Sequence, residues 1–287
     1  RPYCVRVMSR MKKIALFTIW ILVWVALCAG ILELAVRTQL VRVTVMMWNV
    51  RYEFDWDILF RIKPRCHPDI GPHGNRLTPA TRSARPAHLV VLQGDSFAYG
   101  VNVFPSNTIA AALEQRLGTG YGVMNFGIAG YGPDQALLQL KRTVLKLKPE
   151  TVALTLFPAN DFADLAKNRI FTAGADGWLV PTRTNVLLER IPVWRSRFVI
   201  EAIYNDLRHN KKHNDKLYRF LLCDPCDTDI PLNSASPVSQ SKIALMRAVL
   251  REYRDTLQTH KIPFHAVIIP SFEAIIKPDF FAQKGVT

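Results

Sequence analysis

One serine in this sequence stands where a nucleophile would be useful. Residues 89–92 are apolar and rich in branched side chains, and they lead into Gly94, Asp95 and Ser96. A short apolar run that ends at such a turn is typical of a buried strand. In a parallel sheet ligands bind beyond the carboxyl ends of the strands, so Ser96 would face a substrate. A second interpretation, a strand exit followed by a helix cap, uses the same residues and stays open.

Two later stretches could supply the other groups that such a nucleophile needs. Residues 125–130 read Asn-Phe-Gly-Ile-Ala-Gly, and Asn160 and Asp161 follow the next apolar run. Acyl transfer from an ester needs a nucleophile, a base, and donors aimed at the oxygen that becomes negative. The backbone amides of Ser96 and Gly130 and the side-chain amide of Asn160 are the candidate donors. Taken alone, Gly130 is a flexible turn and Asn160 a loop cap, and Asp161 is interpreted as a structural cap.

Together these stretches resemble, in order and spacing, three of the four sequence blocks of the SGNH, or GDSL-like, hydrolases. The resemblance covers about residues 89–271. It implies a three-layer α/β/α sandwich with a parallel, flavodoxin-like sheet. It also implies Ser96 as the nucleophile and Gly130 and Asn160 as donors of the oxyanion hole, with no cofactor and no metal. The chain departs from the family at Pro158 and Ala159, which stand where the family usually has glycine.

The catalytic base is not evident from the sequence. The fourth block, Asp-x-x-His near the carboxyl end, is not found at its expected place. Asp206 and His209 match its letters but precede the last predicted strand, so they are a weak candidate pair. His265 begins an apolar strand and is expected to be packed, while His260 ends a helix, where a cation is favoured. We expect the missing block to lie beyond residue 287, which would leave little turnover; an authentic short protein is the alternative.

The elements that must hold these groups follow from alternating periodic patterns. Strands are expected over residues 89–92, 122–126, 151–157 and 264–270, and helices over residues 107–117, 133–147 and 241–259. Such alternation predicts a parallel α/β sheet with right-handed crossovers. Residues 166–240 are polar and basic, and we interpret them as an insertion beside the site. Two interpretations of this insertion stay open: a lid that covers the substrate, and a variable surface loop without that role.

The N-terminal region predicts a membrane anchor. Residues 14–32 are an uninterrupted apolar run, and about 20 such residues suffice to cross a bilayer. The basic residues before it favour a cytoplasmic N-terminus and a domain on the periplasmic side. We therefore divide the chain into a cytoplasmic segment, an anchor, a juxtamembrane stalk with lead-in, and a hydrolase-like domain, at residues 1–13, 14–36, 37–84 and 85–287. A cleaved signal peptide is the competing interpretation of the apolar run.

Charge and cysteine content narrow the classes of partner. The formal net charge is +14, but residues 1–85 alone hold 14 basic against 5 acidic side chains. Beside a membrane segment, this excess favours contact with anionic lipid over nucleic acid, for which no motif is present. Cys223 and Cys226 are the only close cysteine pair, and they supply two ligands where structural zinc needs four. They are interpreted as a local disulfide, with free thiols as the alternative.

The function predicted from these features is a serine ester hydrolase or O-acyl (acetyl) transferase that acts on an extracytoplasmic acylated carbohydrate. The carbohydrate part is implied by the resemblance alone. The alternative is a noncatalytic binding or assembly protein that keeps the fold without the base. Residues 74–77 read Gly-Asn-Arg-Leu and loosely resemble the Asn-x-x-Gly-Phe-Arg lead-in of exported relatives. The alternative interpretation of these residues is a plain turn.

Overall fold

The computed structural model describes residues 13, 15–28, 30–31, 44–47, 50–55, 57–83, 86–182, 230 and 234–270. The chain divides into two compact units, Arg1–Val45 and Met46–Thr287. In the first unit, residues 15–28 are helical, and large apolar side chains such as Leu16 and Trp20 are exposed. None of the helices in the described residues is long and apolar enough to cross a membrane. The predicted anchor, residues 14–36, includes positions outside the described ranges.

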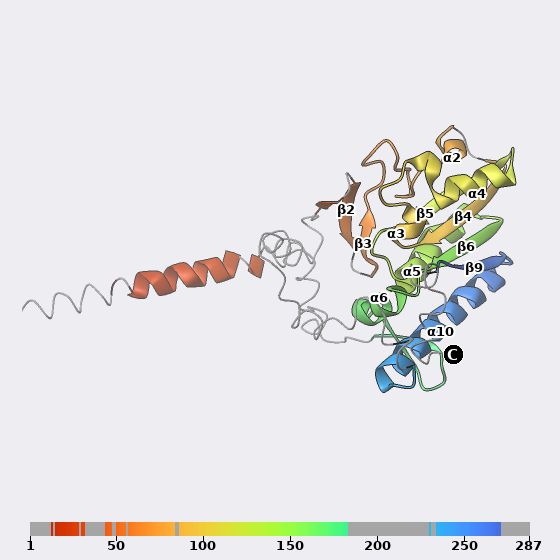
Figure 1. Cartoon of the computed structure of the whole chain (residues 1–287). Helices are drawn as coiled ribbons and strands as arrows, with labels where there is room; N and C mark the ends of the chain where they lie inside the picture. The colour runs from red at the N-terminus through yellow and green to blue at the C-terminus, as the bar shows by residue number, and fades with distance from the viewer. Residues whose placement is uncertain are drawn as a thin grey trace, which may run out of the picture. The chain divides into compact units, whose positions relative to one another are not determined.

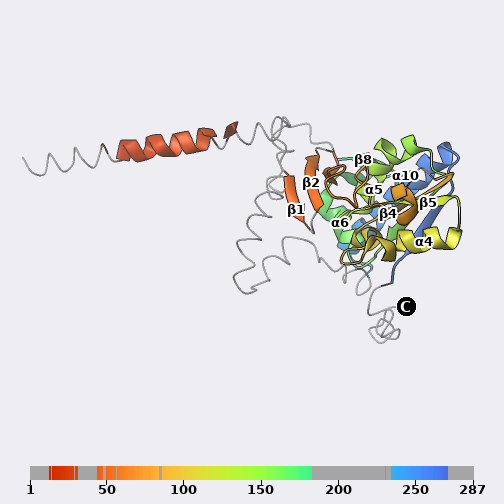
Figure 2. The same ribbon diagram turned by 90° about the horizontal axis from the view of Figure 1, so that it is seen from above.

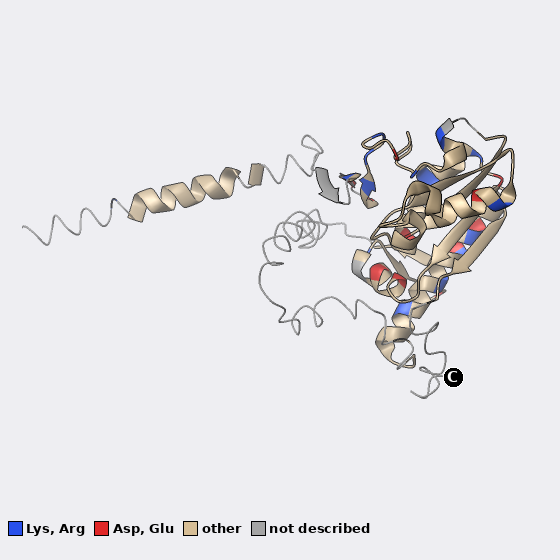
Figure 3. Cartoon of the chain, turned by 45° about the horizontal axis from the view of Figure 1, so that its top comes forward, with Lys and Arg blue, Asp and Glu red and all other residues tan. Residues whose placement is uncertain are grey.

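A parallel sheet of four strands forms the centre of the second unit (Figure 1). Its strands lie in the order β5-β4-β6-β9, with the bounds β4 (His88–Gly94), β5 (Tyr121–Gly127), β6 (Thr151–Leu156) and β9 (Phe264–Ile268). The register places Gly94 opposite Gly127, and Gln93 opposite both Phe126 and Leu154. None of these four strands contains Lys, Arg, Asp or Glu. The blue and red residues of Figure 3 therefore lie outside these four strands. The predicted parallel α/β sheet is confirmed.

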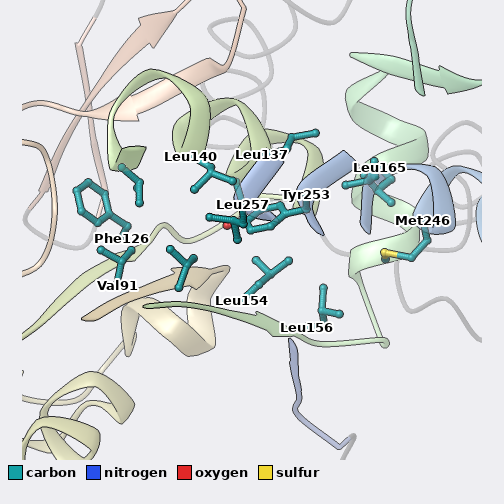
Figure 4. Packing of buried hydrophobic residues seen from close by; sticks show 14 of the residues in the cluster. Val91, Phe126, Leu137, Leu140, Leu154, Leu156, Leu165, Met246, Tyr253 and Leu257 are labelled. Carbon is teal, nitrogen blue, oxygen red and sulfur yellow. The ribbon is translucent and has the colours of Figure 1, made fainter. Parts of the chain in front are cut away.

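Helices cover both faces of this sheet, as the two perpendicular views show (Figures 1 and 2). On one face α4 (Ile109–Leu117) packs on β5, where Ala110 lies in a buried cluster with Val90, Leu92 and Val123. On the other face lie α5 (Pro133–Arg142), α6 (Asp161–Asn168) and α10 (Pro237–Thr259). Figure 4 shows the larger core between these helices and the sheet, including Val91, Phe126, Leu137, Leu140, Leu154, Met246, Tyr253 and Leu257.

The predicted helix ends are close to the observed ones, and local chemistry explains the differences. Ser236 caps α10 by accepting a hydrogen bond from the Ser239 amide at 3.1 Å, with Pro237 in the first turn, so this helix begins before residue 241. The helix predicted for residues 133–147 is broken at Thr143. Its C-terminal part is a 3₁₀ turn, η2 (Val144–Leu147).

A buried polar bridge joins β4, the strand before Ser96, to α10. Gln93 of β4 donates from Nε2 to the Ala136 carbonyl at 3.0 Å and to Gln139 Oε1 at 2.7 Å. Its Oε1 accepts a hydrogen bond from the Tyr253 hydroxyl of α10. Gln93 and Tyr253 are both fully buried, so these bonds satisfy polar atoms that would otherwise be costly inside the core.

Residues 50–83, which fall within the segment predicted as a stalk and lead-in, residues 37–84, lie in the larger unit. A separate sheet has the order β1-β2-β3, with the bounds β1 (Thr44–Met47), β2 (Val50–Asp55) and β3 (Leu59–Ile62). Tyr52 and Phe60 have ring centroids 5.8 Å apart, and Phe60 lies 5.2 Å from the ring of Tyr131. This aromatic contact packs the sheet onto the loop before α5. The short helix α2 (Pro79–Ser83) then leads to β4.

The predicted insertion, residues 166–240, is structured at both of its ends. Its first residues complete α6, and an antiparallel hairpin follows, formed by β7 (Phe171–Ala173) and β8 (Leu179–Pro181). Arg251 of α10 lies over the Trp178 ring at 5.1 Å, which ties the hairpin to the core helix. Asp206, His209, Cys223 and Cys226 lie outside the described residues.

Candidate active site

The turn that carries Ser96 is built by close packing around Gly94. Gly94 has a φ of 146°, which glycine adopts readily, and a Cβ atom there would overlap the Thr155 hydroxyl. Asp95 caps α3 (Ser96–Tyr99), because its Oδ1 accepts a hydrogen bond from the Phe97 amide at 2.9 Å. Ser96 is the first residue of this short helix and is partly exposed. The strand therefore delivers Ser96 to the surface, and the capping role belongs to Asp95.

Ser96 and Asn160 stand on either side of the point where the strand order reverses. Counted along the chain, the four parallel strands occupy the sheet in the order 2-1-3-4, so the reversal lies between β4 and β6. In open α/β sheets ligands bind at this switch point, beyond the carboxyl ends of the strands. Ser96 follows β4 and Asn160 follows β6. The topology therefore places both residues at the edge of the sheet where a ligand binds.

Side-chain contacts join the two loops directly. The rings of Phe97, which follows Ser96, and Phe157, three residues before Asn160, have centroids 4.3 Å apart. Burial raises the pKa of the Asp95 carboxyl, and hydrogen bonds from the Phe97 amide and the Asn160 side chain oppose that rise. Asp161 is the buried first residue of α6 and accepts a hydrogen bond from the Phe157 amide at 2.6 Å, so it holds the turn before the helix, while Asn160 occupies the N-cap position. Asp95 and Asp161 thus hold the loops that present Ser96 and Asn160.

The loop after β5 packs against α3 with almost no space between the backbones. Asn125 donates from Nδ2 to the Ala98 carbonyl at 2.7 Å, and its Oδ1 accepts the Gly127 amide at 2.9 Å. A Cβ atom at Gly127 would lie 2.6 Å from the carbonyl carbon of Ala98. Asn125 and Gly127, which both belong to the stretch 125–130 that resembles the second family block, therefore have packing roles. Their contacts bring the β5 loop against the Ser96 helix.

The two backbone amides proposed as donors to a negative oxygen are free of hydrogen bonds within the described part of the chain, whereas the Asn160 side chain is hydrogen-bonded to Asp95. Gly130 is exposed and has a φ of 83°. Two residues before it, the Ile128 amide donates a hydrogen bond to the Gly94 carbonyl at 3.0 Å. Neither the Ser96 amide nor the Gly130 amide donates a hydrogen bond to another described residue. In other enzymes such a donor is worth about 3 kcal/mol of transition-state stabilisation. These two amides and Asn160 come from three loops at one edge of the sheet.

A buried network behind Gly130 fixes the second loop to α6. Asp134 Oδ1 accepts hydrogen bonds from the Gln135 amide and from Asn168 Nδ2, both at 2.9 Å. Gln135 Oε1 accepts the Gly132 amide at 3.0 Å and a second bond from Asn168 at 2.9 Å. Burial raises the pKa of Asp134 to about 7, against the lowering effect of the Asn168 and Gln135 hydrogen bonds. This network could not be predicted from the sequence, because its members are residue types that are ordinary in helices.

Arg76 supports the Ser96 helix from the opposite end. Its guanidinium donates to the carbonyls of Tyr99 at 2.8 Å, Gly100 at 2.5 Å and Val103 at 2.6 Å. Its backbone amide donates to the Asn125 carbonyl at 2.8 Å. The sequence analysis left residues 74–77 as a loose lead-in resemblance or a plain turn. In the structure this segment includes a turn and also anchors the loop that follows Ser96; the only signal in the sequence was that loose resemblance.

The histidines within the described ranges are engaged elsewhere or exposed. His88 lies at the amino end of β4, the end opposite Ser96, where Nδ1 is 2.6 Å from Glu150 Oε1. His260 ends α10 and contacts the Thr256 carbonyl through Nδ1 at 2.8 Å. The expectation that His265 is packed is wrong, because β9 lies at the sheet edge and this side chain is exposed. No hydrogen bond among the described residues joins a histidine to Ser96.

An open cleft of about 390 Å³ lies beside Ser96. It is bounded by the start of α3, the loop that Arg76 supports, and the start of α4; its lining residues are Ser96, Phe97, Gly100, Val101, Asn102, Val103, Asn107, Thr108 and Ile109. No lining residue carries a charge. The described residues contain no group of three or more His, Cys, Asp and Glu side chains arranged to hold a metal ion.

Comparison with known proteins gives distant structural similarities. No family model and no curated protein matches the chain. Among solved structures, an SGNH-hydrolase family esterase, AlinE4, is 17% identical over 69% of this chain and 84% of its own, with a TM-score of 0.30. A lipolytic protein of the G-D-S-L family from Desulfitobacterium hafniense is 15% identical over 62% and 76%, with a TM-score of 0.25. A catalytic mutant of Axe2, an acetylxylan esterase from Geobacillus stearothermophilus, is 13% identical over 63% and 76%, with a TM-score of 0.28.

Proposed function

We propose that this chain is a serine ester hydrolase or O-acyl transferase of the SGNH/GDSL type, with Ser96 as the nucleophile. One observation carries the proposal. Ser96 and Asn160 follow the two strands that flank the switch point, their loops touch through Phe97 and Phe157, and Gly130 lies on the third loop at the same edge. A serine at this place with convergent amide donors matches the requirements of acyl transfer.

In the proposed reaction, Ser96 Oγ attacks the ester carbonyl carbon and loses its proton to a base. The carbonyl oxygen becomes negative and accepts hydrogen bonds from the Ser96 and Gly130 amides and the Asn160 side chain. The alcohol then leaves with a proton from the base, and water or another hydroxyl takes the acyl group from Ser96. Asp206 and His209 remain the weak candidate pair for the base and its partner.

The finer parts of the proposal concern place and substrate. We place the hydrolase domain on the periplasmic side of a membrane, anchored by residues 14–36, and assign it an acylated carbohydrate. The support for the anchor is the apolar run preceded by basic residues in the sequence. The support for a carbohydrate ester is the resemblance to exported hydrolases.

A fluorophosphonate probe tests the assignment of Ser96. The probe should label Ser96 in the protein produced from its full reading frame, where the base is present, and should not label the Ser96→Ala variant of that protein. Ser106→Ala is the matched control, because Ser106 is an exposed serine in the 3₁₀ turn η1 (Pro105–Asn107) beside the same cleft. It should be labelled like the wild type. Absence of labelling in the wild-type protein would favour a noncatalytic binding protein, and labelling that survives Ser96→Ala would remove Ser96 from the mechanism.

A second arm tests the base. Hydrolysis of p-nitrophenyl acetate should fall by about 10²–10⁴-fold when the general base is replaced. His209→Ala should cause that loss only if Asp206 and His209 form the catalytic pair. His213→Ala is a control of the same residue type in the same stretch of the sequence. Equal rates for both variants would exclude the Asp206 and His209 pair.

A further inference from the structure

The cleft beside Ser96 has an apolar character that the proposed reaction does not by itself require. Three of its lining side chains are large, apolar and well exposed: Phe97 at 43%, Val103 at 41% and Ile109 at 42%. The neighbouring Phe104 is 76% exposed. Clustered apolar side chains around a concave site indicate binding, whereas the same residues scattered over a surface would not.

Two polar side chains of the lining, Asn107 and Thr108, already have hydrogen-bond partners within the protein. Asn107 Oδ1 already accepts a hydrogen bond from the Ser106 hydroxyl at 3.0 Å. The Thr108 hydroxyl donates to the Pro105 carbonyl at 3.0 Å and accepts the Ala111 amide at 3.2 Å as the cap of α4. With no charged side chain in the lining, the cleft suits a neutral and mainly apolar group.

The wall of the cleft is held in place before any ligand arrives. Arg76 is 8% exposed and bonds the carbonyls of Gly100 and Val103, two residues of the lining. Gly100 ends α3 in the left-handed conformation, with a φ of 78°. A preformed wall lowers the ordering cost of binding, so the apolar contacts are available to a ligand.

Continuity with Ser96 identifies the occupant. Ser96 itself lines the cleft, so a group in the cleft lies next to the carbon that Ser96 attacks. Of the two halves of an acylated carbohydrate, the sugar is polar and the acyl chain is apolar. We propose that this cleft binds the acyl chain, and that the natural substrates carry acyl groups longer than acetyl. This inference rests on the proposed function and deepens it.

The size of the cleft limits the length of the chain. A site of about 390 Å³ falls within the range of small-molecule pockets. At about 30 Å³ for a unit the size of a water molecule, which is close to that of a methylene group, the cleft has room for at most roughly 13 carbon atoms. Each methylene that enters should lower Kd by about fourfold until the cleft is full. The expected signature is a steady gain in affinity with chain length, followed by a plateau.

Equilibrium binding of straight-chain primary amides, from ethanamide to decanamide, tests the inference without turnover. These probes carry the acyl chain and its carbonyl but react far more slowly than esters. Kd is measured by ligand-observed NMR titration on the wild-type protein and on two variants. Ile109→Trp fills the cleft, and Leu117→Trp is the matched control, since Leu117 is on the same helix, is 38% exposed and is not in the lining.

The expected result is a fourfold gain per methylene in the wild type and Leu117→Trp, and a plateau at shorter chains in Ile109→Trp. Circular dichroism must show that both variants are folded. A Kd independent of chain length would overturn the inference, as would equal effects of the two variants. Binding of a methyl pyranoside that Ile109→Trp abolishes, without length-dependent amide binding, would assign the cleft to the sugar instead.

Failure of this inference and failure of the proposed function give different results. If the fluorophosphonate labels Ser96 while the amides show no length dependence, the esterase proposal stands and the acyl cleft is wrong. If the amides show the length dependence but Ser96 is never labelled, the apolar binding site stands. The protein would then be an acyl-binding protein without hydrolase activity.

Discussion

Asp134 should make this fold less stable as the pH rises. Burial raises its pKa in the folded chain to about 7, and the charge of Asp164 adds to the rise. An unfolded aspartate has a pKa of about 3.9. Between roughly pH 4 and pH 7 the folded state therefore holds a proton that the unfolded state has lost, so stability falls by about 1.4 kcal/mol per pH unit. The contribution of this proton to the free energy of unfolding is fully present below pH 4, and about 4 kcal/mol is lost as the pH rises through 7.

The substitution Asp134→Asn removes this titration and keeps the Oδ1 acceptor for Gln135 and Asn168. Its new NH₂ group takes the place of Asp134 Oδ2, which is buried and has no hydrogen-bond partner among the described residues. An unpaired buried donor costs about 1–3 kcal/mol at every pH. The protonated Asp134 carboxyl carries an unpaired O–H at the same place, so we expect the variant to be about as stable as the wild type at pH 4.5 and more stable than it at pH 8.

Urea unfolding followed by far-UV circular dichroism at pH 4.5, 6 and 8 measures the difference in free energy. Groups that titrate in both proteins cancel in this difference. Asp176→Asn is the matched control, because Asp176 is an exposed aspartate in the turn between β7 and β8. A difference for Asp134→Asn that does not change across this range would refute the assignment of a buried, protonated carboxyl.

Three further substitutions test the supports of the site. Arg76→Ala leaves three carbonyls without their charged donor and should lower the free energy of unfolding by about 3 kcal/mol. Fluorophosphonate labelling of Ser96 should also slow. Arg76→Lys should restore only part of the stability and part of the labelling rate. Gly127→Ala forces a Cβ against the Ala98 backbone and should cost about 1–3 kcal/mol in chemical denaturation. Glu114→Gln should cost a similar amount, since both carboxylate oxygens accept hydrogen bonds, from Thr78, Ala80 and Val123. A loss under 0.5 kcal/mol in any of the three would contradict the corresponding contact.

The parallel sheet could be predicted from the sequence because its signals are local. Each of the four strands is a short apolar run without a charged residue, and each pairs with its neighbour in parallel, as the alternation with helices required. The positions of Ser96, Gly130 and Asn160 after these strands followed from the same pattern. Predicting that three turns meet at one edge required only the rule for parallel sheets.

Contacts between distant residues could not be predicted in the same way. Residues 50–62 mix apolar, aromatic and charged side chains and read as a stalk, yet Tyr52 and Phe60 are buried by packing that involves Tyr131. Arg76 reads as one more basic residue in a turn until the carbonyls that follow Ser96 are placed around it. His265 reads as core because its neighbours are apolar, but its exposure depends on the place of β9 in the sheet.

The bridge between Gln93 and Tyr253 has a consequence for how the chain folds. The two residues are 160 positions apart in the chain. The hydrogen bond to Gln93, in the strand that leads to Ser96, therefore comes from a helix that is synthesised much later. Contacts of such large sequence separation slow folding, since the loop between them must close before they form. Until α10 emerges, Val91, Phe126 and Leu154 lack the helix that covers them. During translation this apolar face therefore stays uncovered until α10 is made, and Gln93 can accept the Tyr253 hydroxyl only after α10 has docked.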